Sequence, residues 1–318
     1  LINVIVLSAI SAVTSAHASL LLGQQKIGAY NLIQITVPLL TFLTCLFQWT
    51  TQNELDYVLA LYIAFGFSFA LSVFYLWRSF PSTKDVQQSW RTVWRSMFAL
   101  GFFNQLAHVL QLLSFRASYY ILEQYHGTYE VGVYSNASSI TESIWLIATS
   151  ISLWQYATIA NTQDQQYTIQ ITEKLARFGL LASLVGVVFF LLLPADFYRY
   201  VFGPDFGEIQ QLMWVLAPGV WVFTYALVVG HYFSGHGRYR VNAFASGVGL
   251  VFSILASFAL IPSYGAFGGA IAASISYTAT SAVIVYCFLK DGAVFSIFPS
   301  KAELEQLFTQ IRVLWRKS

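Results

Sequence analysis

Nine apolar stretches recur along the chain, each close to the length of a membrane-spanning helix and separated by short polar loops. A helix needs about 20 mainly apolar residues to cross the hydrocarbon core of a bilayer. The stretches lie at residues 1–22, 28–48, 55–77, 97–122, 129–157, 173–193, 209–233, 241–261 and 266–289. Because spanning backbone must satisfy its own hydrogen bonds, the pattern predicts an all-α, polytopic membrane protein with about nine transmembrane helices.

The longest polar connection, residues 78–96, separates a three-span segment, residues 1–77, from a six-span segment, residues 97–289. Its proline and the three-to-four spacing of its later apolar residues predict a turn and then an amphipathic helix on the cytoplasmic surface. A plain solvated loop is the alternative. Residues 290–318 combine a capping-box pattern, an apolar helical face and basic residues. We expect this tail to be a second cytoplasmic amphipathic helix, anchored on the inner surface or bound to a partner.

Loop charge alternates in sign along the chain and predicts the orientation. Cationic loops are retained on the cytoplasmic side, and those of this chain contain Lys26; Arg78, Lys84, Arg91 and Arg95; Lys174 and Arg177; Arg238 and Arg240; and, in the tail, Lys290, Lys301, Arg312, Arg316 and Lys317. The opposite loops contain Glu54 and Asp56; Glu123 and Glu130; and Asp196, Asp205 and Glu208. We therefore expect residue 1 outside and the C-terminus in the cytoplasm.

Composition agrees with this assignment and narrows the function. The chain is 57% hydrophobic and 9% charged, where a soluble domain has roughly 25% charged residues. Its net charge is only +2, and its charged residues are divided between the two sides of the membrane rather than gathered in one basic patch. We therefore expect no nucleic-acid partner. Cys45 and Cys287 lie within apolar spans and suggest no disulfide or metal site. The sequence has no P-loop, HExxH or GxSxG pattern and no large extramembrane domain. Any transport would therefore draw on an ion gradient or on the gradient of the substrate.

Polar side chains inside the fourth span are the first candidates for function, because such groups are costly in hydrocarbon. Asn104, His108 and Gln111 share one helical face at steps of four and three. Arg116 lies nearer the outer end and could hold a phosphate or carboxylate through paired hydrogen bonds. The alternatives are that Arg116 reaches the headgroups or pairs with Glu123.

The fifth span adds Asn136 and Glu142 within an otherwise apolar segment. An antiparallel hairpin of the fourth and fifth spans would bring Glu142 and His108 to similar depth. His108 is either a packing histidine or a proton-coupling group, and Glu142 is the stronger candidate for function.

Three phrases between residues 116 and 276 resemble bacterial polysaccharide flippases, the O-antigen translocases of the multidrug, oligosaccharidyl-lipid and polysaccharide exporter superfamily. The first begins at Arg116 and reads RASYYILEQYHGTYEVGVYSNASS. The second, from Tyr200, reads YVFGPDFGEIQQLMWVLAPG. The third consists of Gly235 to Arg238 followed, from Leu260, by LIPSYGAFGGAIAASIS. An acidic residue common after the arginine in that family is absent, since Ala117 and Ser118 follow it.

The resemblance implies two lobes of about six spans each, with a basic linker between them. Because the linker here follows the third span, residues 1–77 would be a partial first lobe whose leading three spans are missing. We expect a multi-pass protein of the bacterial inner membrane that is not an enzyme. It would move an undecaprenyl-diphosphate-linked oligosaccharide from the inner to the outer leaflet by alternating access, for O-antigen, capsule or exopolysaccharide synthesis.

The resemblance also assigns roles to the candidate residues. Arg116 would attract the diphosphate or an acidic sugar, and the remaining residues would line the sugar path or couple ions: Asn104, His108, Gln111, Asn136 and Glu142. No cofactor is expected beyond a coupling H⁺ or Na⁺, as in an antiporter. Expected partners are the lipid-linked substrate, membrane lipids and other polysaccharide-assembly proteins. Multidrug efflux, peptidoglycan-precursor flipping, and membrane-embedded polymerase or acyltransferase activity are the alternatives.

Overall fold

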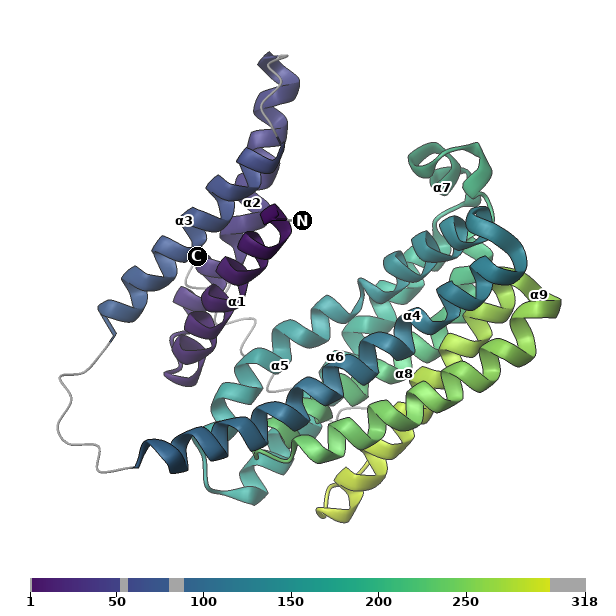
Figure 1. The fold of residues 1–318 in the computed structure, drawn as a ribbon. Coiled ribbons are helices and arrows are strands. Elements are labelled where there is room, and N and C mark those ends of the chain that lie inside the picture. Colours follow the sequence, from purple (N-terminus) through teal and green to yellow (C-terminus); the bar gives the residue numbers. More distant parts are fainter. Residues whose placement is uncertain (1, 52–56, 80–88, 298–318) are drawn as a thin grey trace, which may run out of the picture. The chain divides into compact units, whose positions relative to one another are not determined.

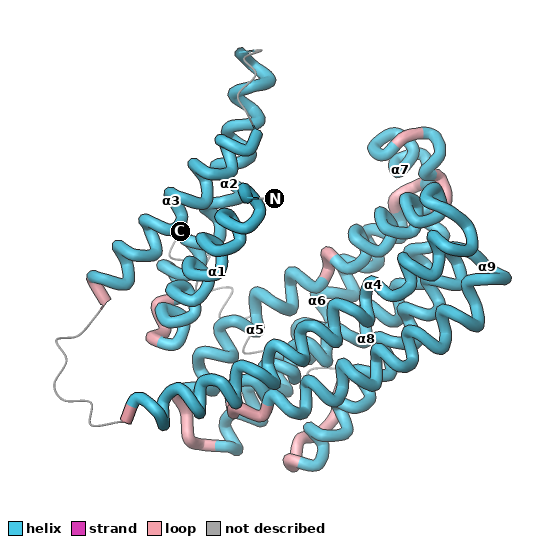
Figure 2. The backbone as a smooth tube through the Cα atoms, in the orientation of Figure 1, coloured by secondary structure: helices cyan, strands magenta, loops and turns pink. Residues whose placement is uncertain are grey.

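The computed structural model describes residues 2–51, 57–79 and 89–297. These residues form helices and connecting loops, and no strand occurs among them (Figure 2). Seven of the helices are long and apolar enough to cross a membrane. The predicted all-α, multi-pass membrane architecture is therefore confirmed. Contacts divide the chain into two compact units, residues 1–89 and 90–318.

The first unit is a bundle of three helices: α1 (Ile2–Gly23), α2 (Ile27–Thr51) and α3 (Tyr57–Trp77). The buried face of α3 consists mainly of small residues at every fourth position: Ala60, Ala64, Ser68 and Ser72, followed by Leu76. Small side chains let helices approach closely where lipid gives no hydrophobic drive for association. Polar contacts also join the helices. His17 Nδ1 of α1 lies 2.9 Å from Ser72 Oγ of α3, and Ser68 Oγ of α3 donates to the Ile33 carbonyl of α2 over 3.1 Å.

The second unit contains the remaining described helices: α4 (Trp90–Glu142), α5 (Trp145–Ala160), α6 (Gln165–Leu192), the short α7 (Ala195–Phe202), a 3₁₀ turn η1 (Pro204–Phe206), α8 (Ile209–Gly235) and α9 (Tyr239–Lys290). Helix α8 is the most enclosed of the spanning helices and contacts α4, α5, α6 and α9. It therefore forms the centre of this unit, and the other helices bury their apolar faces against it.

Helices α4 and α9 each consist of two antiparallel arms. With 53 and 52 residues, either would reach about 80 Å if straight, far beyond the roughly 30 Å hydrocarbon core. Each reverses at a glycine with positive φ, Gly127 (φ 81°) in α4 and Gly265 (φ 54°) in α9, where other residues would be strained. Figure 1 shows both reversals at the same end of the unit. The two hairpins explain why nine predicted crossing segments correspond to seven long helices, and the fifth segment is completed by the shorter α5.

The two reversals are joined by hydrogen bonds. His126, just before the α4 turn, donates from Nε2 to the Ile261 carbonyl over 2.8 Å. Glu130, just after that turn, accepts the Ala266 backbone N–H at 3.1 Å. Ala266 begins the second arm of α9, so this carboxylate occupies the helix end that favours negative charge. Each hairpin thereby holds the turn of the other.

The first arms of α4 and α9 run in parallel and meet along a ladder of serines. Ser253 Oγ donates to the Ser114 carbonyl over 2.8 Å, and one turn further Ser257 Oγ donates to Ser118 Oγ over 3.4 Å. The Ser114 hydroxyl also lies 2.7 Å from Ser276 Oγ of the second α9 arm. These hydroxyls satisfy one another inside the bundle while keeping the backbones close.

Two predicted surface segments are described only in part. Residues 80–88 of the predicted linker lie outside the described residues, and its last residues, from Trp90, form the start of α4. Residues 298–318 of the predicted amphipathic tail also lie outside them. The assignments of the linker and the tail stay predictions.

Candidate functional site

The α4 hairpin brings polar residues from its two arms into one enclosed layer. The rings of Tyr119 and Tyr134 meet edge to face with centroids 5.2 Å apart, and the Tyr119 hydroxyl lies 2.6 Å from Ser138 Oγ. These contacts fix the register of the two arms. In this register Glu142 lies within electrostatic range of Arg116. The sequence predicts that His108 lies at a depth similar to that of Glu142. In the structure His108 lies on the first arm, about two turns further from the reversal than Arg116.

Arg116 is held by a neighbouring tyrosine rather than by an acid. Its Nη1 donates to the Tyr119 hydroxyl, and its guanidinium carbon lies 4.9 Å from the Tyr119 ring centroid. The guanidinium has five N–H donors, so the Tyr119 bond leaves most of them available to another acceptor. The alternative pairing with Glu123 is absent from the described contacts of Arg116, and Glu123 is exposed.

Glu142 receives a hydrogen bond from the opposite side of the bundle. The Tyr277 hydroxyl, on the second arm of α9, donates to Glu142 Oε1 over 2.6 Å. A carboxylate inside a low-dielectric bundle needs such donors or a cation, and this one has Tyr277 in contact and Arg116 nearby. The site therefore holds opposite charges from the two arms of α4, linked to α9 by a hydroxyl.

The helix is interrupted directly after Glu142. The backbone N–H of Ile144 bonds to the Thr141 carbonyl and that of Leu146 to the Ser143 carbonyl, which is the i→i+3 pattern of a 3₁₀ turn. The predicted fifth span is thus two helical pieces, the second arm of α4 and α5, and not one helix. Short 3₁₀ stretches within a helix often coincide with functional hinges.

An aromatic cluster covers one side of the Glu142–Tyr277 pair. Phe115, Trp145, Phe223 and Tyr277 pack with ring centroids between 4.9 and 5.6 Å apart. Trp145 satisfies its indole N–H by donating to the Val220 carbonyl of α8 over 3.0 Å. The rings exclude water from that side, which strengthens the interaction of Glu142 with its donor.

The other predicted residues do not join this site. Asn104 and Gln111 are half-buried, and within the described part of the chain neither side chain has a hydrogen-bond partner. His108 is exposed and lies within electrostatic range of His231 of α8. Asn136 donates to the Gly132 carbonyl of its own helix over 2.9 Å. Their assignment to a sugar path stays a prediction.

Three residues at the centre of the site were not identified from the sequence: Tyr119, Ser138 and Tyr277. Tyr119 lies three residues after Arg116, a spacing that places both on one helical face, so that contact was accessible from sequence. Tyr277 could not be found in this way, because it is 135 residues from Glu142 and meets it only through the packing of α9 on α4.

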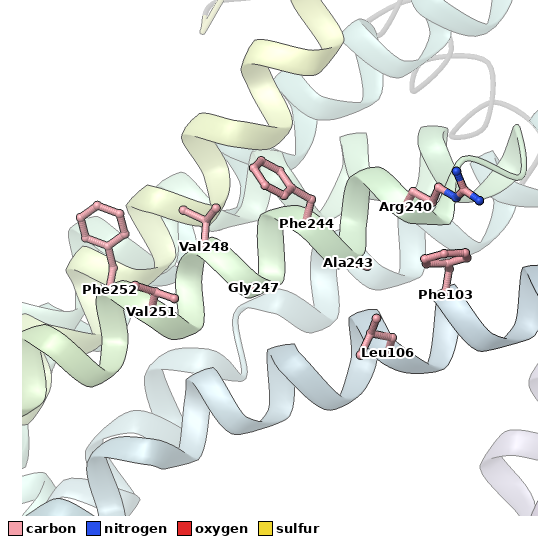
Figure 3. Close-up of a pocket in the computed structure, with 9 residues that line it drawn as sticks. All are labelled: Phe103, Leu106, Arg240, Ala243, Phe244, Gly247, Val248, Val251 and Phe252. Carbon is pink, nitrogen blue, oxygen red and sulfur yellow. The ribbon is translucent and has the colours of Figure 1, made fainter.

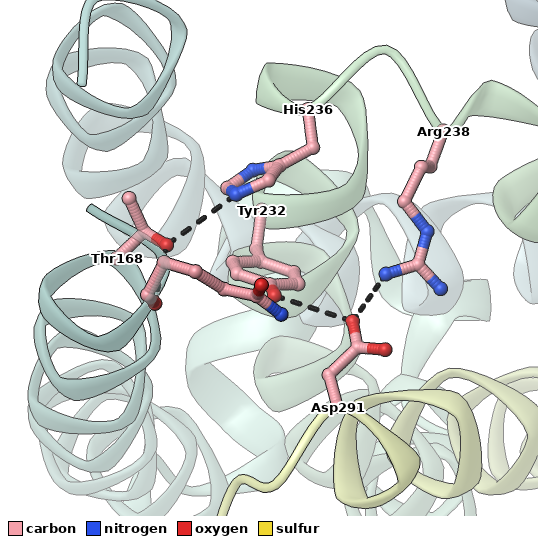
Figure 4. A network of polar contacts seen from close by, with 6 residues as sticks. Thr168, Tyr232, His236, Arg238 and Asp291 are labelled. Carbon is pink, nitrogen blue, oxygen red and sulfur yellow. Dashed lines mark hydrogen bonds and ion pairs between the residues drawn. The ribbon is translucent and has the colours of Figure 1, made fainter. Parts of the chain in front are cut away.

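A second polar cluster ties the helix ends opposite the two reversals (Figure 4). Asp291 accepts hydrogen bonds from the Tyr232 hydroxyl at 3.2 Å and from Arg238 Nη1. His236 Nε2 lies 3.4 Å from Thr168 Oγ1. The cluster joins α6, α8 and the end of α9. None of its contacts within the described residues involves a residue of the site around Glu142. We interpret it as a structural clasp.

Comparison with known proteins finds one informative relative. Over 159 residues the chain is 26% identical to the capsular polysaccharide biosynthesis protein CapF of Staphylococcus aureus. The aligned segment covers 49% of this chain and 40% of that protein, so the match spans less than half of either. No family model matches the chain, and no solved structure matches it.

Proposed function

We propose that this chain belongs to a transporter that moves an undecaprenyl-diphosphate-linked oligosaccharide from the inner to the outer leaflet of the bacterial plasma membrane. The relative named for capsular polysaccharide biosynthesis supports the class of pathway. The observation that carries the proposal is that the half-buried Arg116 and Glu142 lie on the two arms of the α4 hairpin, within electrostatic range of each other, with Glu142 bonded to Tyr277 of α9. Charged groups in such positions are costly and are typical of substrate or ion pathways.

In this proposal Arg116 binds the anionic diphosphate or an acidic sugar. Its contact with Tyr119 holds the guanidinium in place, and its remaining donors suit the paired oxygens of a phosphate. An anion bound there would weaken the attraction between Arg116 and Glu142. H⁺ or Na⁺ at Glu142 would then couple the ion gradient to substrate movement, and the 3₁₀ turn after Glu142 would absorb the accompanying helix motion.

The remaining parts of the proposal follow from orientation and chemistry. The basic helix ends and the C-terminus would face the cytoplasm, where the lipid-linked substrate is assembled. The protein would not be an enzyme, and it would act beside other polysaccharide-assembly proteins. Asn104, His108, Gln111 and Asn136 would line the path of the sugar, with His108 open to it.

Complementation tests this function. The intact protein, expressed in a strain that lacks its own flippase, should restore surface polysaccharide. Arg116→Ala and Glu142→Gln should each lower it about tenfold or more, since a hydrogen bond to a charged group contributes about 1.5–3 kcal/mol. Arg95→Ala and Glu123→Gln are matched controls, because they change exposed residues of the same helix.

Protein abundance in the membrane must be equal across the variants, and lipid-linked oligosaccharide should accumulate where surface polysaccharide is lost. Wild-type surface polysaccharide in both Arg116→Ala and Glu142→Gln would overturn the proposal. Altered drug susceptibility in these variants, with normal polysaccharide, would instead favour multidrug efflux.

A further inference from the structure

An open apolar groove runs along the second unit between the first arms of α4 and α9, away from the site around Glu142 (Figure 3). Its volume is about 880 Å³. Phe103 and Leu106 form its α4 wall, and Phe244, Val248 and Phe252 lie along its α9 wall. The walls offer almost no hydrogen-bonding groups, so the groove suits a hydrocarbon chain and not a sugar.

One cation stands at the end of the groove. Arg240 is exposed, and its guanidinium carbon lies 4.7 Å from the Phe103 ring centroid. Within the described ranges it has no carboxylate partner, whereas Arg238, two residues earlier, is paired with Asp291. A smaller cavity of about 360 Å³ continues past Arg240 toward Arg238. The end of the groove is thus positive and open to an anion.

The length of the groove matches one leaflet. Arg240 and Phe252 are twelve residues apart on one helix arm, which corresponds to about 18 Å. Half of the hydrocarbon core is roughly 15 Å thick. A chain that starts at the charged end would therefore reach about the middle of the bilayer at Phe252.

From the charge and the length together, we propose that the groove binds an anionic glycerophospholipid, with its phosphate on Arg240 and one acyl chain along α9 toward Phe252. Basic pockets between spanning helices are a recognised setting for anionic headgroups. The lipid would fill the space between two parallel helices beyond their serine ladder, and so hold them together. With the orientation proposed above, it would come from the inner leaflet.

Native mass spectrometry of the intact protein in detergent tests this site. Dioleoylphosphatidylglycerol and dioleoylphosphatidylcholine are compared, because they share acyl chains and differ in net charge. The wild type should bind the anionic lipid about fivefold more tightly. Arg240→Ala should reduce that binding to the level of phosphatidylcholine, and Arg240→Lys should retain most of it.

The apolar wall is tested separately with Gly247→Phe. A Cβ on Gly247, which lines the groove, would meet only Leu110 Cδ1, at the ordinary distance of 3.7 Å, so the ring can enter the groove. This variant should weaken binding of both lipids. Gly101→Phe and Arg95→Ala are the matched controls, since Gly101 has no atom within 4 Å of an added Cβ and Arg95 is exposed on the same helix.

Equal binding of the two lipids by the wild type would overturn the proposal, as would unchanged binding in Arg240→Ala and Gly247→Phe. Displacement of phosphatidylglycerol by inorganic phosphate alone would also overturn it, by showing an anion site without a chain. A cysteine introduced in place of Phe252 tests whether the chain's own first unit occupies the groove. If this cysteine cross-links to residues 2–79 and the cross-link abolishes lipid binding, the groove belongs to the first unit and not to a lipid. None of these readouts requires transport, so failure here leaves the proposed function standing, and the reverse is also true.

Discussion

The first arm of α4 has polar residues along its whole length, but its two halves use them differently. In the half nearer the reversal, Ser114 and Ser118 bond to serines of α9, and Arg116 bonds to Tyr119. In the other half, Asn104 and Gln111 have no hydrogen-bond partner within the described part of the chain, and His108 is exposed. The same polar pattern in the sequence thus corresponds to two physical situations.

The difference teaches what a polar stripe in a spanning helix does and does not indicate. Polarity predicts that a face avoids lipid, because unpaired polar groups are costly there. It does not tell whether the groups are satisfied by other helices or left open to a cavity. The satisfied serines are expected to contribute stability, and the open half, together with the unused donors of Arg116, is expected to be available to ligands or water.

The largest expected difference comes from placing the same bulky side chain in each half. Ser114 is 3% exposed and lies against two arms of α9. Ser114→Leu should therefore lower the free energy of unfolding by about 2 kcal/mol, since overpacking typically costs 1–3 kcal/mol. Gln111→Leu, one turn away on the open half, should change it by less than about 0.5 kcal/mol.

Denaturant titration of the purified protein in detergent, followed by circular dichroism, measures both variants. Equal destabilisation would mean that the open half is packed in the membrane as tightly as the satisfied half, and the comparison would fail.

A smaller difference is expected from the hydroxyl network itself. Tyr119→Phe and Ser138→Ala each remove one side of the 2.6 Å contact between the α4 arms. Their double-mutant cycle should give a coupling of roughly 0.6 kcal/mol, the average for hydrogen bonds between spanning helices. The cycle of Asn104→Ala with Gln111→Ala should be additive within about 0.3 kcal/mol. Additivity in both cycles would show that the network contributes no coupling.

Much of the fold was predictable from the sequence because the bilayer imposes helix length and backbone satisfaction. Gly127 lies between the predicted spans that its turn joins, and Gly265 lies in the closing phrase that resembles the flippases. The sequence did not predict α7 (Ala195–Phe202), whose eight residues are too few to give a spanning pattern. It also did not predict the 3₁₀ break after Glu142, since no proline or glycine marks that position.

The candidate site was predictable only in part, for a related reason. Arg116 and Glu142 were identifiable because charges inside apolar spans are costly. Whether either has a partner depends on contacts between distant segments, such as Tyr277 with Glu142. Asn104, His108 and Gln111 have the same local signature as the partnered residues, and helical periodicity alone cannot separate the two groups.

The smallest expected effect concerns a residue that has a partner but lies at an exposed helix end. His236 caps α8 outside the spanning segment and contacts Thr168. Partial burial lowers its pKa below the ordinary value of about 6.5. The folded protein therefore binds this proton less tightly than the unfolded chain does, so the stabilisation from neutral His236 is present above about pH 6.5 and is lost as the pH falls through the lowered pKa.

The denaturant concentration at the midpoint of unfolding should decrease as the pH is lowered from about 7.5 to about 5.5. It should decrease less in His236→Gln, which retains a polar group without the titration. If both proteins show the same pH dependence, the contact of His236 with Thr168 contributes no pH-dependent stability. This partnered residue would then behave like the unpartnered residues in the open half of α4.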